Sequence, residues 1–348
     1  MAKENTTRIW QDTTRIIRIF REKGKRIAIL IHVNPDGDAV GSALGLKKVL
    51  ENIGHACSVI SPNEIPDFLK WMPGCDSIVI YEDESKKAAE LIGASEVIIA
   101  LDFNNLKRVI EFENIVIPGS SYILMIDHHP DPDNFANCII SDVSASSTAE
   151  IVYQFLKSEN LHNYIDNDAA TCLFTGIVTD TGCFSYNSSD SNTYNIVAEL
   201  LAYGIDKNRI YSLLYDNFSY DRMKLLGYAL YNKMVILPEL STGYIWFTME
   251  ELERFSFTAG DTEGFVNYPL SIHGIRFSAF FVEKKDYIKV SFRSKGDFEA
   301  NNFARRYFNG GGHMNAAGGE SYNNMNDTLK YFKEMLLENR EKLNEYED

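Results

Sequence analysis

The fold of this chain is indicated by the stretch Ile27-Ala28-Ile29-Leu30-Ile31-His32-Val33-Asn34-Pro35-Asp36-Gly37-Asp38. Its apolar first half predicts a β-strand over Ile27–Val33. Its second half brings a histidine and two aspartates to the end of that strand. In a parallel α/β sheet such strand ends gather at one edge, where ligands bind. The stretch therefore predicts an α/β domain with a polar site at a sheet edge.

A second polar cluster, Asp127-His128-His129, directly follows the apolar run Tyr122–Ile126. Two single aspartates, Asp102 and Asp180, also follow apolar runs. A lone acid in such a place is usually a helix cap or a solvated loop residue. Here the polar residues stand together at the predicted ends of four strands. They are His32, Asp36, Asp38, Asp102, Asp127, His128, His129 and Asp180.

The chemistry of this set predicts a metal site. Burying so much negative charge without a cation would be strongly unfavourable. Carboxylates with imidazoles suit Mn²⁺ or Mg²⁺ better than the thiolate-rich ligand sets of structural zinc. Two such ions close together need a shared carboxylate and terminal ligands from several strand ends. We therefore expect a two-metal centre.

Strands and helices alternate over residues 1–200, which predicts a doubly wound, mainly parallel sheet. Ser147-Thr148-Ala149-Glu150 is typical of a capping box at a helix start. The remaining expected elements are a helix within Thr6–Glu22, a helix over Gly41–Asn52, and strands over Cys57–Ile60, Glu96–Leu101, Tyr122–Ile126 and Ala169–Thr179.

A smaller α+β domain is expected after a helical connector that runs from Thr193 to Met234. We place the domains at 1–203 for the metal-binding part, 204–233 for the helical linker and 234–345 for the second domain. In the second domain two helices flank a glycine cluster. The expected elements there are strands Val235–Leu237, Tyr244–Phe247, Arg276–Val282 and Ile288–Phe292, and helices Glu299–Phe308 and Asp327–Lys342.

Composition limits the classes of protein to consider. A chain of 348 residues fits two domains, and its net charge of −15 argues against a general binder of long nucleic acid. No apolar run approaches the ~20 residues that span a bilayer, and the first residues lack the apolar stretch of a signal peptide. We therefore expect a cytoplasmic protein with no membrane partner and no long duplex partner.

Three motifs resemble the DHH phosphoesterase superfamily. They are His32-x-x-Pro35-Asp36-Gly37-Asp38-Ala39, Asp127-His128-His129 and Thr179-Asp180-Thr181-Gly182. Further on, Val290-Ser291-Phe292-Arg293-Ser294 and the tail Asn309-Gly310-Gly311-Gly312-His313-x-x-Ala316-Ala317-Gly318 resemble the DHH-associated domain that often follows. Length and layout are most similar to the bifunctional oligoribonuclease and pAp phosphatase (nanoRNase) type.

The resemblance implies a role for each motif residue. His32 and Asp36 would bind one Mn²⁺ ion, Asp38, His128 and Asp180 a second, and Asp102 would bridge the two, with Mg²⁺ as a substitute. His129 would face the phosphate and the nucleophile, and Asp127 would orient His128. Three glycines after a helix are often only a stop and a turn. With the adjacent histidine they suit an anion nest, so we expect a substrate phosphate to be bound by Arg293, Gly310, Gly311, Gly312 and His313.

The implied activity is hydrolysis of short oligoribonucleotides to 5′-mononucleotides, removal of the 3′-phosphate of pAp, or both, by two-metal activation of water. The expected partners are short RNA or a nucleotide bisphosphate, and a homodimer is compatible with the sequence. The segment after Asp102, Phe103-Asn104-Asn105, departs from the family pattern and leaves the substrate open. Cleavage of pApA or cyclic di-AMP is the nearest alternative. A non-catalytic nucleotide-binding module would be expected to lose metal ligands, and none is missing.

Overall fold

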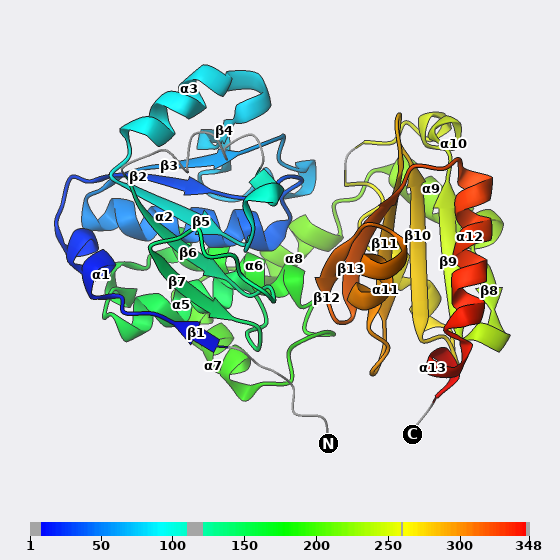
Figure 1. Cartoon of the computed structure of the whole chain (residues 1–348). Helices are drawn as coiled ribbons and strands as arrows, with labels where there is room; N and C mark the ends of the chain where they lie inside the picture. The colour runs from blue at the N-terminus through cyan, green and yellow to red at the C-terminus, as the bar shows by residue number, and fades with distance from the viewer. Residues whose placement is uncertain (1–7, 110–120, 259, 346–348) are drawn as a thin grey trace. The chain divides into compact units, whose positions relative to one another are not determined.

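The computed structural model describes residues 8–109, 121–258 and 260–345. The chain forms two compact units, Met1–Asn217 and Phe218–Asp348, and the elements of each can be followed by colour in Figure 1. The division falls inside the predicted linker, and the predicted domain limits stay a prediction. Among the described residues, no helix combines the length and apolar composition needed to cross a membrane.

The first unit is built on a seven-stranded sheet with the order β1-β7-β6-β5-β2-β3-β4. Apart from the antiparallel pair of β1 and β7, all its strand pairs are parallel. The chain order reverses between β2 and β5, which is where α/β sheets place ligands. The strands are β1 Arg8–Trp10, β2 Arg26–Leu30, β3 Ala56–Ser61, β4 Val79–Ile80, β5 Val97–Leu101, β6 Tyr122–Asp127 and β7 Cys138–Asp142.

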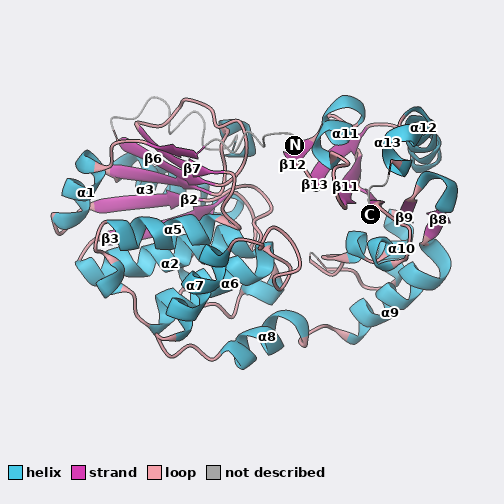
Figure 2. Cartoon of the chain, turned by 90° about the horizontal axis from the view of Figure 1, so that it is seen from below, coloured by secondary structure: helices cyan, strands magenta, loops and turns pink. Residues whose placement is uncertain are grey.

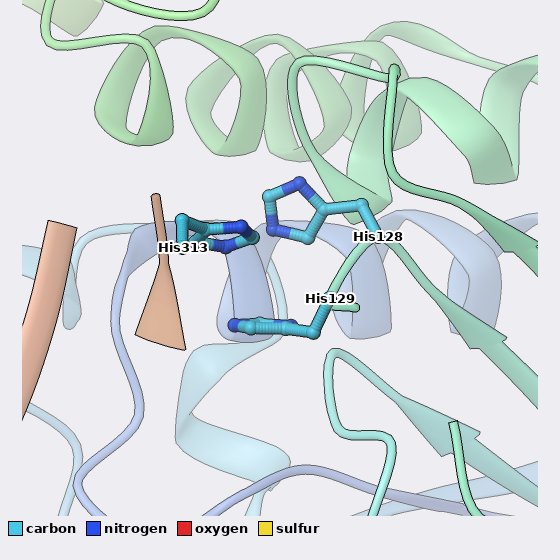
Figure 3. Close-up of side chains that lie close together, drawn as sticks. All are labelled: His128, His129 and His313. Atoms are coloured by element: carbon cyan, nitrogen blue, oxygen red, sulfur yellow. The ribbon is translucent and has the colours of Figure 1, made fainter. Parts of the chain in front are cut away.

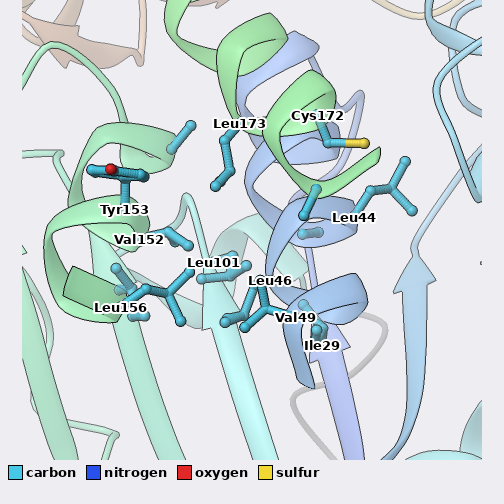
Figure 4. Close-up of a cluster of buried hydrophobic side chains, with 14 of the residues drawn as sticks. Ile29, Leu44, Leu46, Val49, Leu101, Val152, Tyr153, Leu156, Cys172 and Leu173 are labelled. Carbon is cyan, nitrogen blue, oxygen red and sulfur yellow. The ribbon is translucent and has the colours of Figure 1, made fainter. Parts of the chain in front are cut away.

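Helices cover both faces of this sheet, as the predicted doubly wound fold requires. Alternate residues of β2 enter two different cores, with Ile27 and Ile29 in one and Ala28 and Leu30 in the other. Figure 2 shows α2, α5 and α6 together on one face, and Figure 4 shows part of the apolar core between these helices and the strands. The helices are α1 Thr14–Arg21, α2 Gly37–Ile53, α3 Tyr81–Ala94, α5 Thr148–Ser158, α6 Asn167–Asp180, α7 Ser191–Leu201 and α8 Lys207–Tyr215.

Glycines let α2 and α6 approach one another closely. A Cβ atom on Gly41 would lie 2.5 Å from the carbonyl oxygen of Cys172, and one on Gly45 would lie 2.7 Å from Leu173 Cγ. Protein interiors tolerate such overlap poorly, because they are already close-packed. The contact fixes the N-terminal end of α2 beside the C-terminal end of α6. Both ends carry predicted metal ligands.

Two predicted elements in this unit need correction. The apolar run Ala169–Thr179 is part of helix α6 and not a strand, so Asp180 ends a helix. Its residues are buried on nearly all sides, which removes the periodicity that separates helix from strand. The helix expected within Thr6–Glu22 begins only at Thr14, after β1; residues 6 and 7 lie outside the described residues.

The expected capping box at α5 is half present. The Ser147 hydroxyl accepts a hydrogen bond from the backbone N–H of Glu150. In return the Glu150 carboxylate accepts from the N–H of Ser146, one residue earlier than a capping box requires.

The second unit has a six-stranded sheet in the order β12-β13-β11-β10-β9-β8, in which only β9 and β10 are parallel. An aromatic-rich core that includes Phe277, Phe292 and Phe332 fills one face. The expected helix over Asp327–Lys342 is two helices that meet at Asn339. The strands are β8 Val235–Leu237, β9 Thr242–Phe247, β10 Phe277–Glu283, β11 Ile288–Ser294, β12 Gly311–His313 and β13 Ala316–Ser321. The helices are α9 Tyr220–Tyr228, α10 Met249–Arg254, α11 Ala300–Tyr307, α12 Met325–Glu338 and α13 Arg340–Asn344.

Candidate metal centre

Asp102 lies at the centre of the predicted ligand set. Three groups of residues that could hold a metal ion contain Asp102, and the donor atoms within each group lie within 4.8 Å of one another. The groups are His32, Asp36 and Asp102; Asp38, Asp102 and His128; and Asp102, Asp127 and His129. They come from the carboxyl ends of β2, β5 and β6 and from the start of α2. The structure therefore brings the predicted residues of the first unit together.

The two oxygens of the Asp102 carboxylate face different imidazoles. Oδ2 lies 3.2 Å from His32 Nε2, and Oδ1 lies 3.6 Å from His128 Nε2. Asp180, at the end of α6, places Oδ2 at 3.6 Å from the same nitrogen of His128. The Asp102 carboxylate therefore lies between His32 and His128, which is the place of a carboxylate that bridges a pair of metal ions.

His32 is oriented to offer a lone pair to the site. Its Nδ1 lies 2.8 Å from the carbonyl oxygen of Val33, which can only accept, so Nδ1 carries a proton. The other ring nitrogen, Nε2, lies 3.2 Å from Asp102 Oδ2 and is the atom that His32 would offer to a metal ion. A backbone carbonyl that fixes the ring in this way is common for histidines that bind metals.

The Asp38 side chain is bound at the start of a helix. Its two oxygens accept hydrogen bonds from the backbone N–H groups of Thr148 at 2.6 Å and Ala149 at 2.9 Å. These groups belong to the first turn of α5, where the helix dipole favours negative charge. Asp36, which is exposed, caps α2 with its Oδ1, which accepts from the backbone of Asp38 and Ala39.

The buried acidic side chains of the site repel one another, which raises the pKa values of two of them. Burial and the charges of Asp102, Asp180 and Asp36 raise the pKa of Asp38 well above its usual value. Burial and neighbouring carboxylates likewise raise the pKa of Asp180 to about 6, although His128 acts in the opposite direction.

The histidines favour ionisation of the central carboxylate. Burial alone would raise the pKa of Asp102, but the hydrogen bond from His32 and the charges of the three histidines lower it overall. Burial would lower the pKa of His128, but Asp180, Asp102 and Asp127 raise it overall. A set of carboxylates that repel one another around an ionised aspartate fits divalent cations.

Figure 3 shows the side chains of His128 and His129, which follow β6. The His129 Nδ1 lies 2.8 Å from Asp127 Oδ1, and its backbone N–H donates to the other oxygen of Asp127. We expected Asp127 to orient His128, whereas these hydrogen bonds go to His129. The Nδ1 atom of His128 lies 3.5 Å from the carbonyl oxygen of Ala145.

Arg108 is a site residue that the sequence analysis missed. Its Nη1 donates to the carbonyl oxygen of Asp102 at 3.1 Å and lies 3.2 Å from His129 Nε2. Because a guanidinium can only donate, Nε2 of His129 accepts, and Nδ1 is the nitrogen that donates to Asp127. Nothing in the sequence around Arg108 marks it, since the contact depends on how the loop after β5 folds back.

The second unit contains the predicted phosphate-binding residues. Arg293 lies in β11, and Gly311–His313 form strand β12 beside β13. The N–H of Gly310 donates to the carbonyl oxygen of Ala304. A Cβ atom on Gly312, which has φ +136°, would lie 2.5 Å from the carbonyl oxygen of Ala316. Close strand contacts therefore explain part of the glycine run.

The chain belongs to the DHH family of phosphoesterases. The description "DHH family, N-terminal domain" matches residues 26–177, and "DHHA1 domain" matches residues 242–338. The first range contains the predicted ligands except Asp180, and the second contains Arg293 and the glycine run.

Two curated relatives combine two activities in their names. The chain is 31% identical over 292 residues to the bifunctional oligoribonuclease and PAP phosphatase NrnA of Bacillus subtilis, which covers 84% of this chain and 88% of the relative. It is 29% identical to the protein of that name from Thermus thermophilus, with 89% of each chain covered. The cyclic-di-AMP phosphodiesterase GdpP of Bacillus subtilis is 28% identical, over 64% of this chain and 35% of the relative.

Solved structures support the fold. An exopolyphosphatase-related protein from Bacteroides fragilis has a TM-score of 0.91 and 42% identity, and the match covers 95% of this chain and 97% of that one. RecJ from Thermus thermophilus in complex with Mn²⁺ has a TM-score of 0.57 at 12% identity, covering 96% of this chain and 54% of that one. The second likeness shows the fold alone.

Proposed function

We propose that this protein is a metal-dependent phosphoesterase that hydrolyses short oligoribonucleotides to 5′-mononucleotides and removes the 3′-phosphate of pAp. The observation that carries the proposal is the Asp102 carboxylate, whose two oxygens face His32 on one side and His128 on the other. The similarity to the NrnA proteins over most of both chains supports the choice of substrates.

The residues of the first unit would hold two Mn²⁺ ions, with Mg²⁺ as a substitute. His32 and Asp36 would bind one ion, Asp38, His128 and Asp180 the other, and Asp102 both. When bound, the ions supply an activated water and stabilise negative charge on the phosphate oxygens. The fit rests on the donor set: burial and the neighbouring carboxylates raise the pKa of Asp38, and divalent cations would offset the repulsion among these carboxylates.

His129 acts beside these ligands. Arg108 and Asp127 fix its ring from opposite nitrogens, so that its proton is on Nδ1. The ring is only partly buried and can contact a phosphate group. Arg108 keeps a positive charge close to that place, where it favours the binding of an anionic substrate.

Residues of the second unit would bind the rest of the substrate. We assign a phosphate group other than the reacting one to Arg293, the backbone of Gly310, Gly311 and Gly312, and His313. The predicted domain limits, a cytoplasmic location and a possible homodimer remain parts of this proposal.

A second candidate substrate is a linear or cyclic dinucleotide such as pApA or cyclic di-AMP. The similarity to GdpP favours it, since this match covers 64% of the chain. It covers only 35% of GdpP, which makes it the weaker candidate.

A substrate panel separates these candidates. Purified protein with Mn²⁺ is given pAp, pApA, cyclic di-AMP and RNA of about two to 24 nucleotides, and products are separated by chromatography. We expect AMP from pAp and 5′-mononucleotides from the shortest RNA, with activity falling as the RNA lengthens. Cleavage of cyclic di-AMP alone would favour the second candidate. No hydrolysis of any member would contradict the proposal.

A further inference from the structure

We propose that Thr148 is a positioning residue whose hydroxyl orients the Asp102 carboxylate for both metal sites. The inference rests on the proposed function and extends it to a residue outside the ligand set. The Thr148 hydroxyl lies 2.9 Å from Asp102 Oδ1 and donates to it. Thr148 has no exposed surface and Asp102 is 1% exposed, so water does not compete for this hydrogen bond.

The hydrogen bond acts on the oxygen that faces the second group of ligands. The same Oδ1 lies 3.6 Å from His128 Nε2, while Oδ2 lies beside His32. A carboxylate whose two oxygens must face two sets of metal ligands has to keep a fixed torsion angle about its Cβ–Cγ bond. His32 and Thr148 contact opposite oxygens and together fix that rotation.

Thr148 also links Asp102 to a second ligand. Its backbone N–H donates to Asp38 Oδ2, and the next N–H, of Ala149, donates to Asp38 Oδ1. One residue at the start of α5 therefore contacts two carboxylates that follow the neighbouring strands β2 and β5. Any movement of this helix end would move both aspartates.

A buried carboxylate anchors the helix end. Glu150, which is 2% exposed, accepts five hydrogen bonds at 2.6–3.2 Å, all of them from uncharged donors. These donors lie in the preceding loop, in α5 itself and in α7. They are the backbone and hydroxyl of Ser146, the amides of Gln154 and Asn192, and the hydroxyl of Thr193. These hydrogen bonds hold the start of α5 in place before a metal ion binds. The side chains of Asp38 and Asp102 therefore have to move less when it binds.

The test compares two substitutions at Thr148 with a matched control. Thr148→Val keeps the shape and removes the hydroxyl, and Thr148→Ser keeps the hydroxyl. Thr175→Val removes an equally buried hydroxyl that bonds the carbonyl oxygen of Thr171 within α6. Thr148→Ala is a second variant without a hydroxyl in case the valine variant does not fold. Mn²⁺ affinity and stoichiometry are measured by calorimetry, folding by circular dichroism, and kcat and KM on pAp.

We expect Thr148→Val to weaken the binding of Mn²⁺ and to lower kcat by roughly 10- to 100-fold, as is usual for partners of metal ligands. Thr148→Ser and Thr175→Val should bind Mn²⁺ like the wild type. Two unaltered Mn²⁺ sites and an unaltered kcat in folded Thr148→Val or Thr148→Ala would overturn the inference. Equal losses in Thr148→Val and Thr175→Val would also overturn it, since the effect would then be one of packing. Failure of the wild type itself to bind Mn²⁺ would instead overturn the proposed function and this inference with it.

Discussion

His32 Nε2 lies 3.2 Å from Asp102 Oδ2, and this contact joins the ends of the neighbouring strands β2 and β5. These are the strands between which the chain order of the sheet reverses. Because the backbone of Val33 fixes the protonated nitrogen of His32, its other nitrogen faces a carboxylate oxygen. A metal ion that binds both atoms would take the place of this hydrogen bond between His32 and Asp102. The contact lies where the sequence predicts a metal site.

Removal of metal should abolish hydrolysis. Protein treated with a chelator and then dialysed should not hydrolyse pAp, and Mn²⁺ should restore the rate better than Ca²⁺. The smaller ion fits closely spaced ligands, whereas Ca²⁺ prefers longer and more numerous contacts. Initial rates after addition of each metal test this. Full activity in excess chelator would exclude a role for the metal.

Arg108→Ala should lower kcat/KM on pAp by roughly 10-fold or more, the usual cost of losing a hydrogen bond to a charged group. The guanidinium contacts both the Asp102 backbone and the His129 ring, so its loss frees that ring. Lys107→Ala is the matched control, because Lys107 is the exposed neighbour in the same turn. Steady-state kinetics on both variants measure the effect. Equal rates in the two variants would place Arg108 outside the site.

Both the successes and the failures of the sequence analysis have physical causes. The strand ending at Ile126 was predicted within one residue, because a short apolar run followed by polar residues has few alternatives. Helix α6 was mistaken for a strand because it is buried on nearly all sides. Thr148 and Arg108 could not be placed in the site, since their contacts with Asp102 and His129 depend on tertiary structure.

Gly41→Ala should destabilise the protein by about 1–3 kcal/mol, the usual cost of overfilling a packed interior. The added methyl group would overlap the backbone of α6 at Cys172 and Gly176. Gly93→Ala is the control: it lies in α3 and its Cβ would meet no atom within 4 Å, so stability should stay equal or rise by about 0.4–1 kcal/mol. Urea unfolding of both variants gives the comparison. A neutral Gly41→Ala would contradict the close helix contact.

Glu251→Gln should destabilise the second unit more at pH 7 than at pH 3.5. Burial raises the pKa of Glu251, but hydrogen bonds from Lys233, Thr248 and Tyr228 lower it overall. Because its pKa is lower in the folded state than in the unfolded state, its contribution is present above its ordinary pKa and is lost as the pH falls through the folded value. Thermal unfolding at both pH values tests this.

The exposed neighbour provides the control for that experiment. Glu250→Gln should leave the melting temperature close to that of the wild type at both pH values. A Glu251→Gln variant whose deficit is the same at pH 7 and pH 3.5 would show that the carboxylate charge does not matter.

If Asp102 is shared by two metal ions, its removal should lower the number of Mn²⁺ ions bound per chain. Equilibrium dialysis is carried out on the wild type, on Asp102→Asn and on the control Asp168→Asn, which changes an exposed aspartate outside the site. We predict two ions for the wild type and the control, and fewer than two for Asp102→Asn. Two ions bound with wild-type affinity by Asp102→Asn would show that the Asp102 carboxylate does not bridge two metal ions.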